Sequence, residues 1–197
     1  CRVLANYTGG VSLPVVETAA SWGGYSGGTL ENCLIWGNRV GPAVRVGSGA
    51  RVVNCTVASN SASATAAAGG VTLSGGAMTN GIVYGNVVGG VADNYAGPAG
   101  AVWYSSAPEL TAGAQGNLNS DPKFVNMAAG DCHLQLGSPC VNSGANLPGI
   151  TVDLEGTNRD AALLDARDQH VHRHAVVVAS PDTGFELGHG RQFVGCT

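Results

Sequence analysis

The stretch Cys33-Leu-Ile-Trp-Gly-Asn38 decides the fold, because three other segments of the chain are versions of it. A shared asparagine precedes three of the four copies, at Asn32, Asn54 and Asn80. A repeat with a constant core and insertions of variable length predicts a solenoid, in which the copies bury their apolar faces by stacking. The other three copies are Cys1-Arg-Val-Leu-Ala-Asn6, Cys55-Thr-Val-Ala-Ser-Asn60 and Gly81-Ile-Val-Tyr-Gly-Asn86.

The length of the apolar runs selects the kind of solenoid. The runs are short and stop at Gly, Asn or Ser, whereas a helical repeat needs about ten or more residues of 3.6-periodic pattern per element. The 31 glycines of the chain also suit short strands joined by turns. We therefore predict an all-β fold, a right-handed parallel β-helix. Its coils should occupy residues 1–116, with the N-terminal coil incomplete, and the final coils and an irregular C-terminal cap of the same domain should occupy residues 117–197.

The repeated asparagines suit the sharp bends between strands. Asparagine tolerates the left-handed backbone conformation, and its side-chain amide both donates and accepts hydrogen bonds. Asparagines stacked at equivalent bends, about 4.8 Å apart, can bond to one another along the solenoid axis. The alternative is a set of separate turns that face solvent. We predict two ladders, one of Asn32, Asn54 and Asn80 and a second of Asn6, Asn38, Asn60 and Asn86.

The cysteines of the repeat are predicted to be buried thiols. Cys1, Cys33 and Cys55 hold equivalent inward positions, so Cys33 and Cys55 should be neighbours on adjacent coils. Stacked Cβ atoms lie near 4.8 Å, which exceeds the roughly 3.8 Å that a disulfide prefers. Cys132 and Cys140 bracket a turn and form a possible disulfide, whereas Cys196 has no obvious partner.

Composition narrows the classes of partner. The chain has 197 residues, of which 44% are hydrophobic and only 11% charged, with a net charge of −4. Nine lysines and arginines without a basic run do not favour a nucleic acid partner. The chain has no apolar run near 18 residues and no signal-peptide pattern, so we expect neither a membrane span nor a signal peptide.

Four motifs follow one another in the second half of the chain. Together they resemble the C-terminal end of bacterial surface β-helix proteins of the pectate-lyase-like superfamily, the group called choice-of-anchor proteins, over about residues 28–190. The resemblance implies a right-handed parallel β-helix that is secreted or displayed at the cell surface. Cys132 departs from the pattern, which has an aromatic residue there. The motifs are GNLNSDPKFVN (116–126), AGDCHLQLGSPCVNSG (129–144), DLEGTNR (153–159) and PDTGFELG (181–188).

The charged C-terminal motifs admit two interpretations. Asp153, Glu155, Arg159, Asp182 and Glu186 could form an acid pair or a calcium site. The interpretation we favour is a charge-assisted network around Arg159 that holds the last coil, so that Arg159→Ala destabilises this end.

A histidine cluster is the candidate for a transition metal. On a strand, His170, His172 and His174 would face one side and could bind Zn²⁺ or Cu²⁺. Three histidines along a strand span about 13 Å, too far for one metal, so a solvated loop is favoured. We therefore expect no cofactor, with calcium or a transition metal as the alternative.

The distribution of carboxylates argues against catalysis by the coils. Lyases and hydrolases of the superfamily place several carboxylates on one groove. Here Glu17, Glu31, Asp93 and Glu109 fall at unrelated positions of the repeat, and residues 1–116 contain no lysine. A catalytic pair in the coils is therefore not expected, and any active site would have to lie in the charged C-terminal part; a structural module is the interpretation we favour over an enzyme.

Three functions remain from the sequence. The first is an extracellular or cell-surface structural module that binds copies of itself head to tail, because a coil that begins in mid-repeat at Cys1 presents strand edges. The second is a carbohydrate-binding module in which Trp36 and Tyr84, at the same repeat position, form a two-ring platform for a polysaccharide; packing under a long loop is the alternative. The third is a polysaccharide lyase or hydrolase acting on an acidic or neutral glycan. Other aromatics considered for sugar binding are Trp22, Tyr25, Trp103 and Tyr104.

Overall fold

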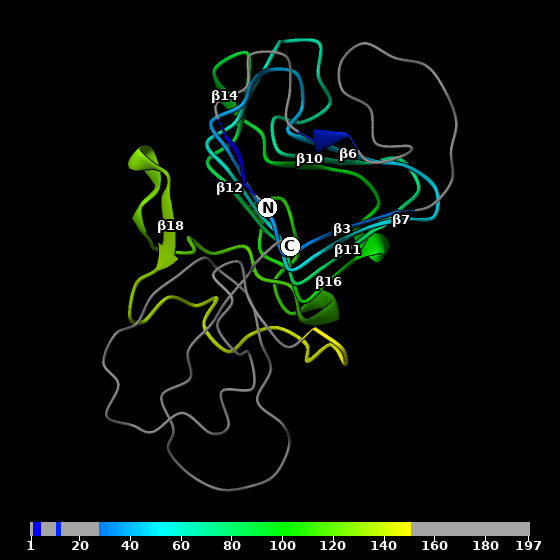
Figure 1. Cartoon of the computed structure of the whole chain (residues 1–197), viewed down its shortest axis with the longest axis vertical. Helices are drawn as coiled ribbons and strands as arrows, with labels where there is room; N and C mark the ends of the chain where they lie inside the picture. Colours follow the sequence, from blue (N-terminus) through cyan, green and yellow to red (C-terminus); the bar gives the residue numbers. More distant parts are fainter. Residues whose placement is uncertain (1, 5–10, 13–27, 151–197) are drawn as a thin grey trace, which may run out of the picture.

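The computed structural model describes residues 2–4, 11–12 and 28–150 (Figure 1). In these ranges the chain forms short strands and single 3-10 turns, and stacked parallel strands make a β-solenoid of about three turns. The predicted all-β class and the parallel β-solenoid are therefore confirmed. The right-handed sense and the division at residue 116 stay predictions.

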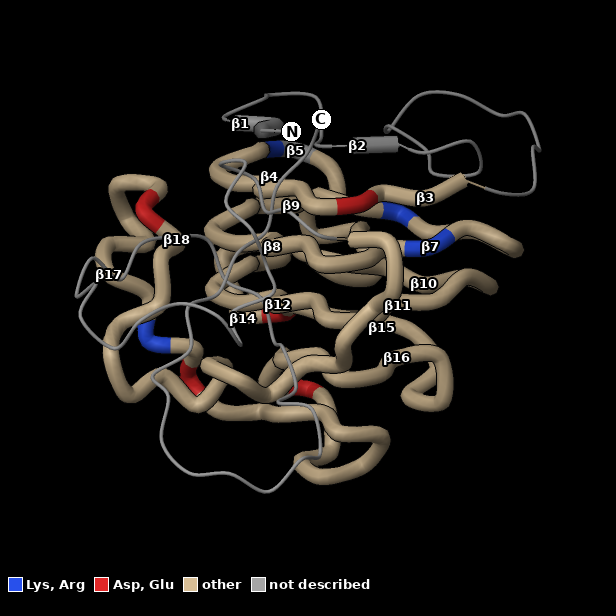
Figure 2. The backbone as a smooth tube through the Cα atoms, turned by 60° about the horizontal axis from the view of Figure 1, so that its bottom comes forward, with Lys and Arg blue, Asp and Glu red and all other residues tan. Residues whose placement is uncertain are grey.

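The strands of successive coils stack into four sheets, which Figure 2 shows from the side. Sheet A contains β1 (Arg2–Leu4), β4 (Leu34–Trp36), β8 (Thr56–Ala58) and β12 (Ile82–Tyr84). Sheet B contains β2 (Val11–Ser12), β6 (Val44–Val46), β10 (Val71–Leu73) and β15 (Tyr95–Ala96). Sheet C contains β3 (Gly28–Glu31), β7 (Ala50–Val53), β11 (Ala77–Thr79) and β16 (Val102–Trp103).

Sheet D differs from the others because it ends in a hairpin. It contains β5 (Arg39–Val40), β9 (Ser61–Ala62), β13 (Val87–Val88) and β14 (Val91–Ala92). The first three strands pair in parallel, whereas β14 folds back antiparallel on β13. The hairpin therefore reverses the chain locally before it enters β15.

The strand register follows the sequence repeat. Val57 of β8 pairs with Ile35 on one side and with Val83 on the other. On sheet C, Val52 pairs in the same way with Leu30 and Met78. These β-branched and apolar side chains fill a narrow core in which Ile35, Val57 and Val83 are fully buried. Stacking buries apolar surface that no single coil could bury alone, which is the main source of stability in a solenoid.

The first predicted asparagine ladder lies at the bend between sheets C and A. Asn32, Asn54 and Asn80 are buried and adopt the left-handed conformation, with φ of 52°, 51° and 53°. Asn80 Nδ2 donates to Asn54 Oδ1 at 2.9 Å. The backbone N–H of each asparagine donates to the strand of the next coil, as Asn54 N does to Thr79 O at 3.0 Å. The backbone therefore ties the bends of this corner along the axis, and a side-chain hydrogen bond joins Asn80 to Asn54, whereas Asn54 Nδ2 is buried without a partner among the described residues.

The second asparagine ladder is longer than the sequence predicts. Asn38 donates through N and Nδ2 to Asn60 Oδ1, both at 2.9 Å, and Asn60 donates in the same way to Asn86 Oδ1 at 3.0 and 2.8 Å. Asn86 then donates to Asn94 Oδ1 at 2.8 and 3.3 Å. Asn94 donates to the Glu109 carboxylate at 2.8 and 3.1 Å. The buried ladder is confirmed, and its predicted member Asn6 lies outside the described residues.

A uniform direction of donation distinguishes this second ladder. Every amide donates toward the Glu109 end, so each accepting oxygen is polarised by the group beyond it. The chain ends on a carboxylate, which accepts charge-assisted hydrogen bonds, and these are stronger than neutral ones. Glu109, which the sequence places at no special position of the repeat, therefore terminates the ladder.

The segment after the coils covers the outer face of sheet A. It contains the 3-10 turns η2 (Ala114–Gly116) and η3 (Met127–Ala129) and the antiparallel hairpin of β17 (Phe124–Asn126) and β18 (Asp131–Leu134), whereas a further 3-10 turn, η1 (Ala99–Ala101), lies within the last coil before β16. Ala145 exchanges backbone hydrogen bonds with the side chain of Asn80, at 2.8 and 2.9 Å. Sheet A is thus buried on both faces. The outer cluster comprises Leu34, Ala58, Ile82, Phe124, Cys132, Leu134 and Cys140.

The cysteines require one correction. Cys33 takes part in a disulfide, and its partner lies outside the described residues because Cys55, Cys132 and Cys140 are free thiols. The prediction of a free thiol at Cys33 was wrong because it rested on an ideal stacking distance near 4.8 Å, whereas Cβ separations at disulfides range up to about 4.5 Å, so a small departure from ideal stacking suffices. The possible disulfide between Cys132 and Cys140 is not formed.

The three free thiols should be chemically inert in the folded protein. Burial raises the pKa of Cys55 and of Cys132 to about 12, and that of Cys140 to about 11. Because the thiolate is the reactive form, we expect a thiol reagent at pH 8 to leave all three unmodified in buffer and to modify them in guanidinium chloride. Mass spectrometry of tryptic peptides checks this. Rapid native labelling of Cys132 or Cys140 would mean that the C-terminal cover opens readily.

Candidate functional site

The two aromatic residues of the predicted sugar platform lie on the outer face of sheet A. Trp36 and Tyr84 occupy equivalent strand positions, but the register places Ala58 between them, so they are two coils apart. Both are half-buried and pack against the C-terminal cluster. The Trp36 indole Nε1 donates to Met127 O at 2.8 Å, and its ring lies against Gly130. Sugar binding by this pair stays a prediction. The hairpin of β17 and β18 covers part of the Trp36 ring, so the two rings are not both open to a ligand to the same extent.

Tyr84, in contrast, lines a pocket beside the same hairpin. The pocket has a volume of about 270 Å³ and opens to solvent. Its wall combines a coil residue with residues of the C-terminal cover, so it forms only when the cover docks on sheet A. The lining residues are Tyr84, Asp121, Lys123, Phe124, Met127 and Gln135.

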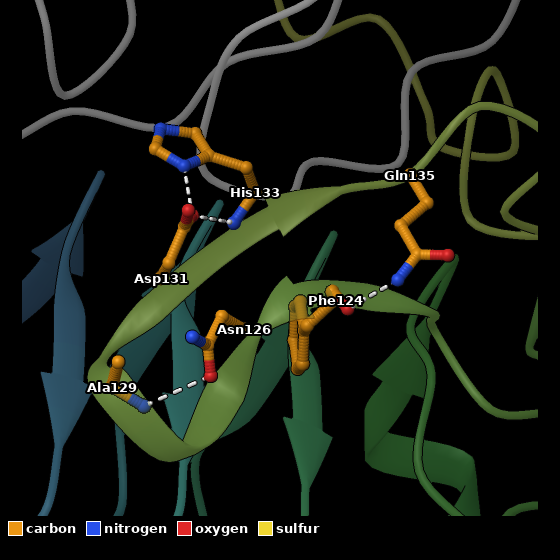
Figure 3. A network of polar contacts seen from close by, with 6 residues as sticks. All are labelled: Phe124, Asn126, Ala129, Asp131, His133 and Gln135. Carbon is orange, nitrogen blue, oxygen red and sulfur yellow. Dashed lines mark hydrogen bonds and ion pairs between the residues drawn. The ribbon is translucent and has the colours of Figure 1, made fainter.

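Local backbone chemistry positions the polar groups of this pocket. Asp121 Oδ1 accepts from Lys123 N at 2.8 Å, which closes a turn in which Lys123 has a φ of 53°. Gln135 N donates to Lys123 O at 2.9 Å, and Gln135 Nε2 donates to Phe124 O at 2.8 Å (Figure 3). Lys123 Nζ donates to Gly137 O at 3.2 Å. Two segments that flank the hairpin are therefore held together at the pocket rim.

The electrostatics of the pocket keep the phenol of Tyr84 protonated. Burial, and to a smaller extent the Asp121 carboxylate, raises the pKa of Tyr84 above 10.0. The hydroxyl is therefore a hydrogen-bond donor at neutral pH, close to a carboxylate that accepts.

A second polar arrangement lies on the opposite strand of the hairpin. Asp131 Oδ1 accepts from His133 N at 3.1 Å and also contacts His133 Nδ1 (Figure 3). The aspartate thus fixes the orientation of the imidazole ring. Neither residue was a site candidate from the sequence, where the alternation of residues i and i+2 on a strand is the only signal that they share a face.

Two coil carboxylates that appear unrelated in the sequence are neighbours in the structure. Burial, followed by the negative charge of Glu109, raises the pKa of Asp93 above 3.8. Their positions in the repeat are unrelated, but the β13–β14 hairpin brings residue 93 back to the end of the ladder. Glu109 accepts the two hydrogen bonds from Asn94, so this carboxylate holds the ladder end.

The raised pKa of Asp93 predicts a small pH effect on stability. Because the folded state binds the proton more tightly than the unfolded state, ionisation of Asp93 costs stability as the pH rises above about 4. Asp93→Asn should therefore raise the free energy of unfolding at pH 7 by a few tenths of a kcal/mol, a small value because the group is solvated. At pH 3 the two proteins should be equally stable. Urea unfolding at both pH values checks this, and a destabilised variant at pH 7 would contradict it.

The remaining aromatic candidates that the structure describes lie at the last coil. Trp103 and Tyr104 are 36% and 40% exposed. Tyr104 occupies the bend position that asparagine holds in earlier coils, with a φ of 48°, and its ring lies against Gly116. This conformation is strained for an aromatic residue. Trp22 and Tyr25 lie outside the described residues.

The other predicted sites also lie outside the described residues. These are the histidine cluster His170, His172 and His174 and the network of Asp153, Glu155, Arg159, Asp182 and Glu186. Within residues 2–4, 11–12 and 28–150, no group of three or more His, Cys, Asp or Glu side chains is placed to hold a metal ion.

Comparison of the chain with protein-family models, with curated proteins and with solved structures finds no match. In the part of the chain that the structure describes, no helix has the length and hydrophobicity that a membrane crossing requires.

Proposed function

We propose that the protein is a structural β-solenoid module without catalytic activity, secreted or displayed at the cell surface. The observation that carries the proposal is the continuous ladder from Asn38 through Asn60, Asn86 and Asn94 to Glu109. In this ladder the buried side-chain amides of one corner form hydrogen bonds that join each coil to the next. A framework of this kind resists local opening, which suits a protein exposed to the extracellular medium.

The C-terminal motifs support the proposed cell-surface location and the proposed relation to a known superfamily. They resemble the ends of bacterial surface β-helix proteins of the pectate-lyase-like superfamily, which are right-handed. The second of these motifs forms β18 and the turn after it, which cover the outer face of sheet A. A cover that protects an apolar sheet face is a structural role, and it gives this second motif a purpose that requires no catalytic site.

The position of the coil carboxylates supports the absence of catalysis. Glu109 accepts two hydrogen bonds from Asn94, so it is engaged within the protein. The nearby Asp93 lies at the same end of the ladder, where Gly69 N donates to its backbone oxygen at 2.9 Å. A lyase or hydrolase needs an acid and a base that face bound substrate.

Two measurements test this function. Antibody detection after cell fractionation and protease treatment of intact producing cells should find the protein outside the cytoplasm. The purified chain, incubated with acidic and neutral polysaccharides with and without calcium, should release neither unsaturated products nor new reducing ends. A product that Glu109→Gln abolishes would replace the structural proposal with an enzymatic one.

Head-to-tail association of copies is part of the same proposal. Among the described strands, β1, β2 and β3 are the outermost members of their sheets toward the first coil. Strand edges of this kind template further pairing. Sedimentation velocity over a range of concentrations should show species larger than the monomer, and monomers alone at the highest concentration would remove association from the proposal.

A further inference from the structure

We infer that the pocket beside Tyr84 binds one ring of a neutral saccharide, such as the terminal residue of a glycan. This inference goes beyond the structural role, because a scaffold requires no ligand site. Its volume of about 270 Å³ lies just below the range of about 300–1,000 Å³ for drug-sized ligands, which suits a single ring.

The apolar part of the pocket suits the face of a sugar ring. Tyr84 comes from β12, Phe124 from β17 and Met127 from the η3 turn, so three separate elements supply this wall. An aromatic ring offers a flat face to the C–H groups of a pyranose, and the thioether of Met127 adapts to irregular shapes.

The polar groups of the rim suit hydroxyl groups. Asp121 Oδ1 accepts a hydrogen bond from Lys123 N, and Asp121 Oδ2 can accept one from a ligand. The Lys123 ammonium has three donors, one of which bonds to Gly137 O. Gln135 Nε2 donates a hydrogen bond to Phe124 O, and Gln135 Oε1 can accept one from a ligand. The rim thus offers both donors and acceptors, as the hydroxyl groups of a sugar require.

The charge of the rim selects a neutral ligand. One carboxylate, Asp121, and one ammonium, Lys123, are the charged groups that line the pocket. An anionic uronate would gain from Lys123 but would be repelled by Asp121 at the same rim. A neutral hexose or N-acetylhexosamine meets no such repulsion.

Saturation-transfer NMR with glucose, galactose, mannose, N-acetylglucosamine and glucuronic acid tests the inference on the full chain. At least one neutral sugar should bind, with a Kd on the order of 1 mM, as expected for a single ring with few contacts. Asp121→Asn and Tyr84→Phe should each weaken binding at least fivefold, since each removes a polar group but retains the size of the side chain. Trp103→Ala is the matched control, because it removes an exposed aromatic residue elsewhere, and should bind as the unmodified chain does.

Three results would overturn the inference. One is the absence of binding by every neutral sugar at concentrations tenfold above the expected Kd. Another is a preference for glucuronic acid. The third is binding that Trp103→Ala abolishes but Asp121→Asn leaves unchanged, which would place the sugar at the last coil. Unchanged circular dichroism and melting of the variants show that each remains folded, and none of these outcomes bears on the structural role.

Discussion

Asn60→Ala is expected to lower the free energy of unfolding by about 3–6 kcal/mol. Asn60 is fully buried, and its Oδ1 accepts from both N and Nδ2 of Asn38. Its Nδ2 donates to Ile35 O and Ala58 O, each at 3.1 Å, and to Asn86 Oδ1. Removal of the amide leaves several buried groups without their partner, and each such group costs about 1–3 kcal/mol.

Urea unfolding followed by circular dichroism measures this effect. Asn119→Ala is the matched control, because Asn119 is exposed and belongs to neither ladder, and it should change stability by less than about 0.5 kcal/mol. A loss below about 1 kcal/mol for Asn60→Ala would mean that water enters the ladder and replaces the amide.

Asn60→Asp separates the role of the donor from that of the acceptor. Aspartate keeps an oxygen toward Asn38 but places a second oxygen against Asn86 Oδ1, Ile35 O and Ala58 O. Burial among acceptors should raise the pKa of this carboxyl in the folded state, so the protonated form folds better. The variant should therefore lose stability as the pH rises from about 4 to 8, by more than the few tenths of a kcal/mol that Asp93 contributes to this trend in the unmodified chain. A variant with no such pH dependence would show that the Nδ2 donor is dispensable.

Gly70→Ala is expected to destabilise the protein by about 3 kcal/mol or more, because no space exists for a methyl group. A Cβ atom at Gly70 would lie 2.3 Å from Asn94 O, 2.6 Å from Val83 Cγ1 and 2.8 Å from Asn86 Nδ2. The Val83 methyl group can move, but Asn94 O is a backbone atom that accepts from Val71 N at 2.8 Å. The added methyl group would therefore push two coils apart and would also displace Asn86 and Asn94 of the second ladder.

Thermal and urea unfolding check this second effect. Gly100→Ala is the control, since the nearest atom to its added Cβ, Gln115 Nε2, is 4.0 Å away. It should be close to neutral. Equal stability of Gly70→Ala and Gly100→Ala would mean that the coils separate at little cost, contrary to the tight stacking described above.

The asparagine ladders show how far the sequence alone extends. Asn32, Asn54 and Asn80 could be placed at left-handed bends for two reasons. Asparagine tolerates this backbone conformation, and it recurs at the same position of the repeat. The sequence could not predict that Asn94 and Glu109 continue the second ladder. Asn94 follows Asn86 by only eight residues rather than by a full coil, and it meets the ladder because the β13–β14 hairpin reverses the chain.

The pocket beside Tyr84 was likewise predictable from the sequence only in part. The sequence identified Tyr84 as a ring on the outer face of a strand, because alternation and repeat position determine which way a strand residue points. It could not determine which segment lies over that face. Asp121, Lys123 and Gln135 reach Tyr84 only through the docking of the cover on sheet A.

The sequence by itself determined the strands, the parallel stacking and the positions of the asparagine bends, because each depends on short-range chemistry repeated from coil to coil. The tertiary structure alone decided the carboxylate at the ladder end, the burial of Trp36 and the pocket beside Tyr84. These features join segments that do not repeat, so their contacts depend on how the non-repeating C-terminal part packs against the coils.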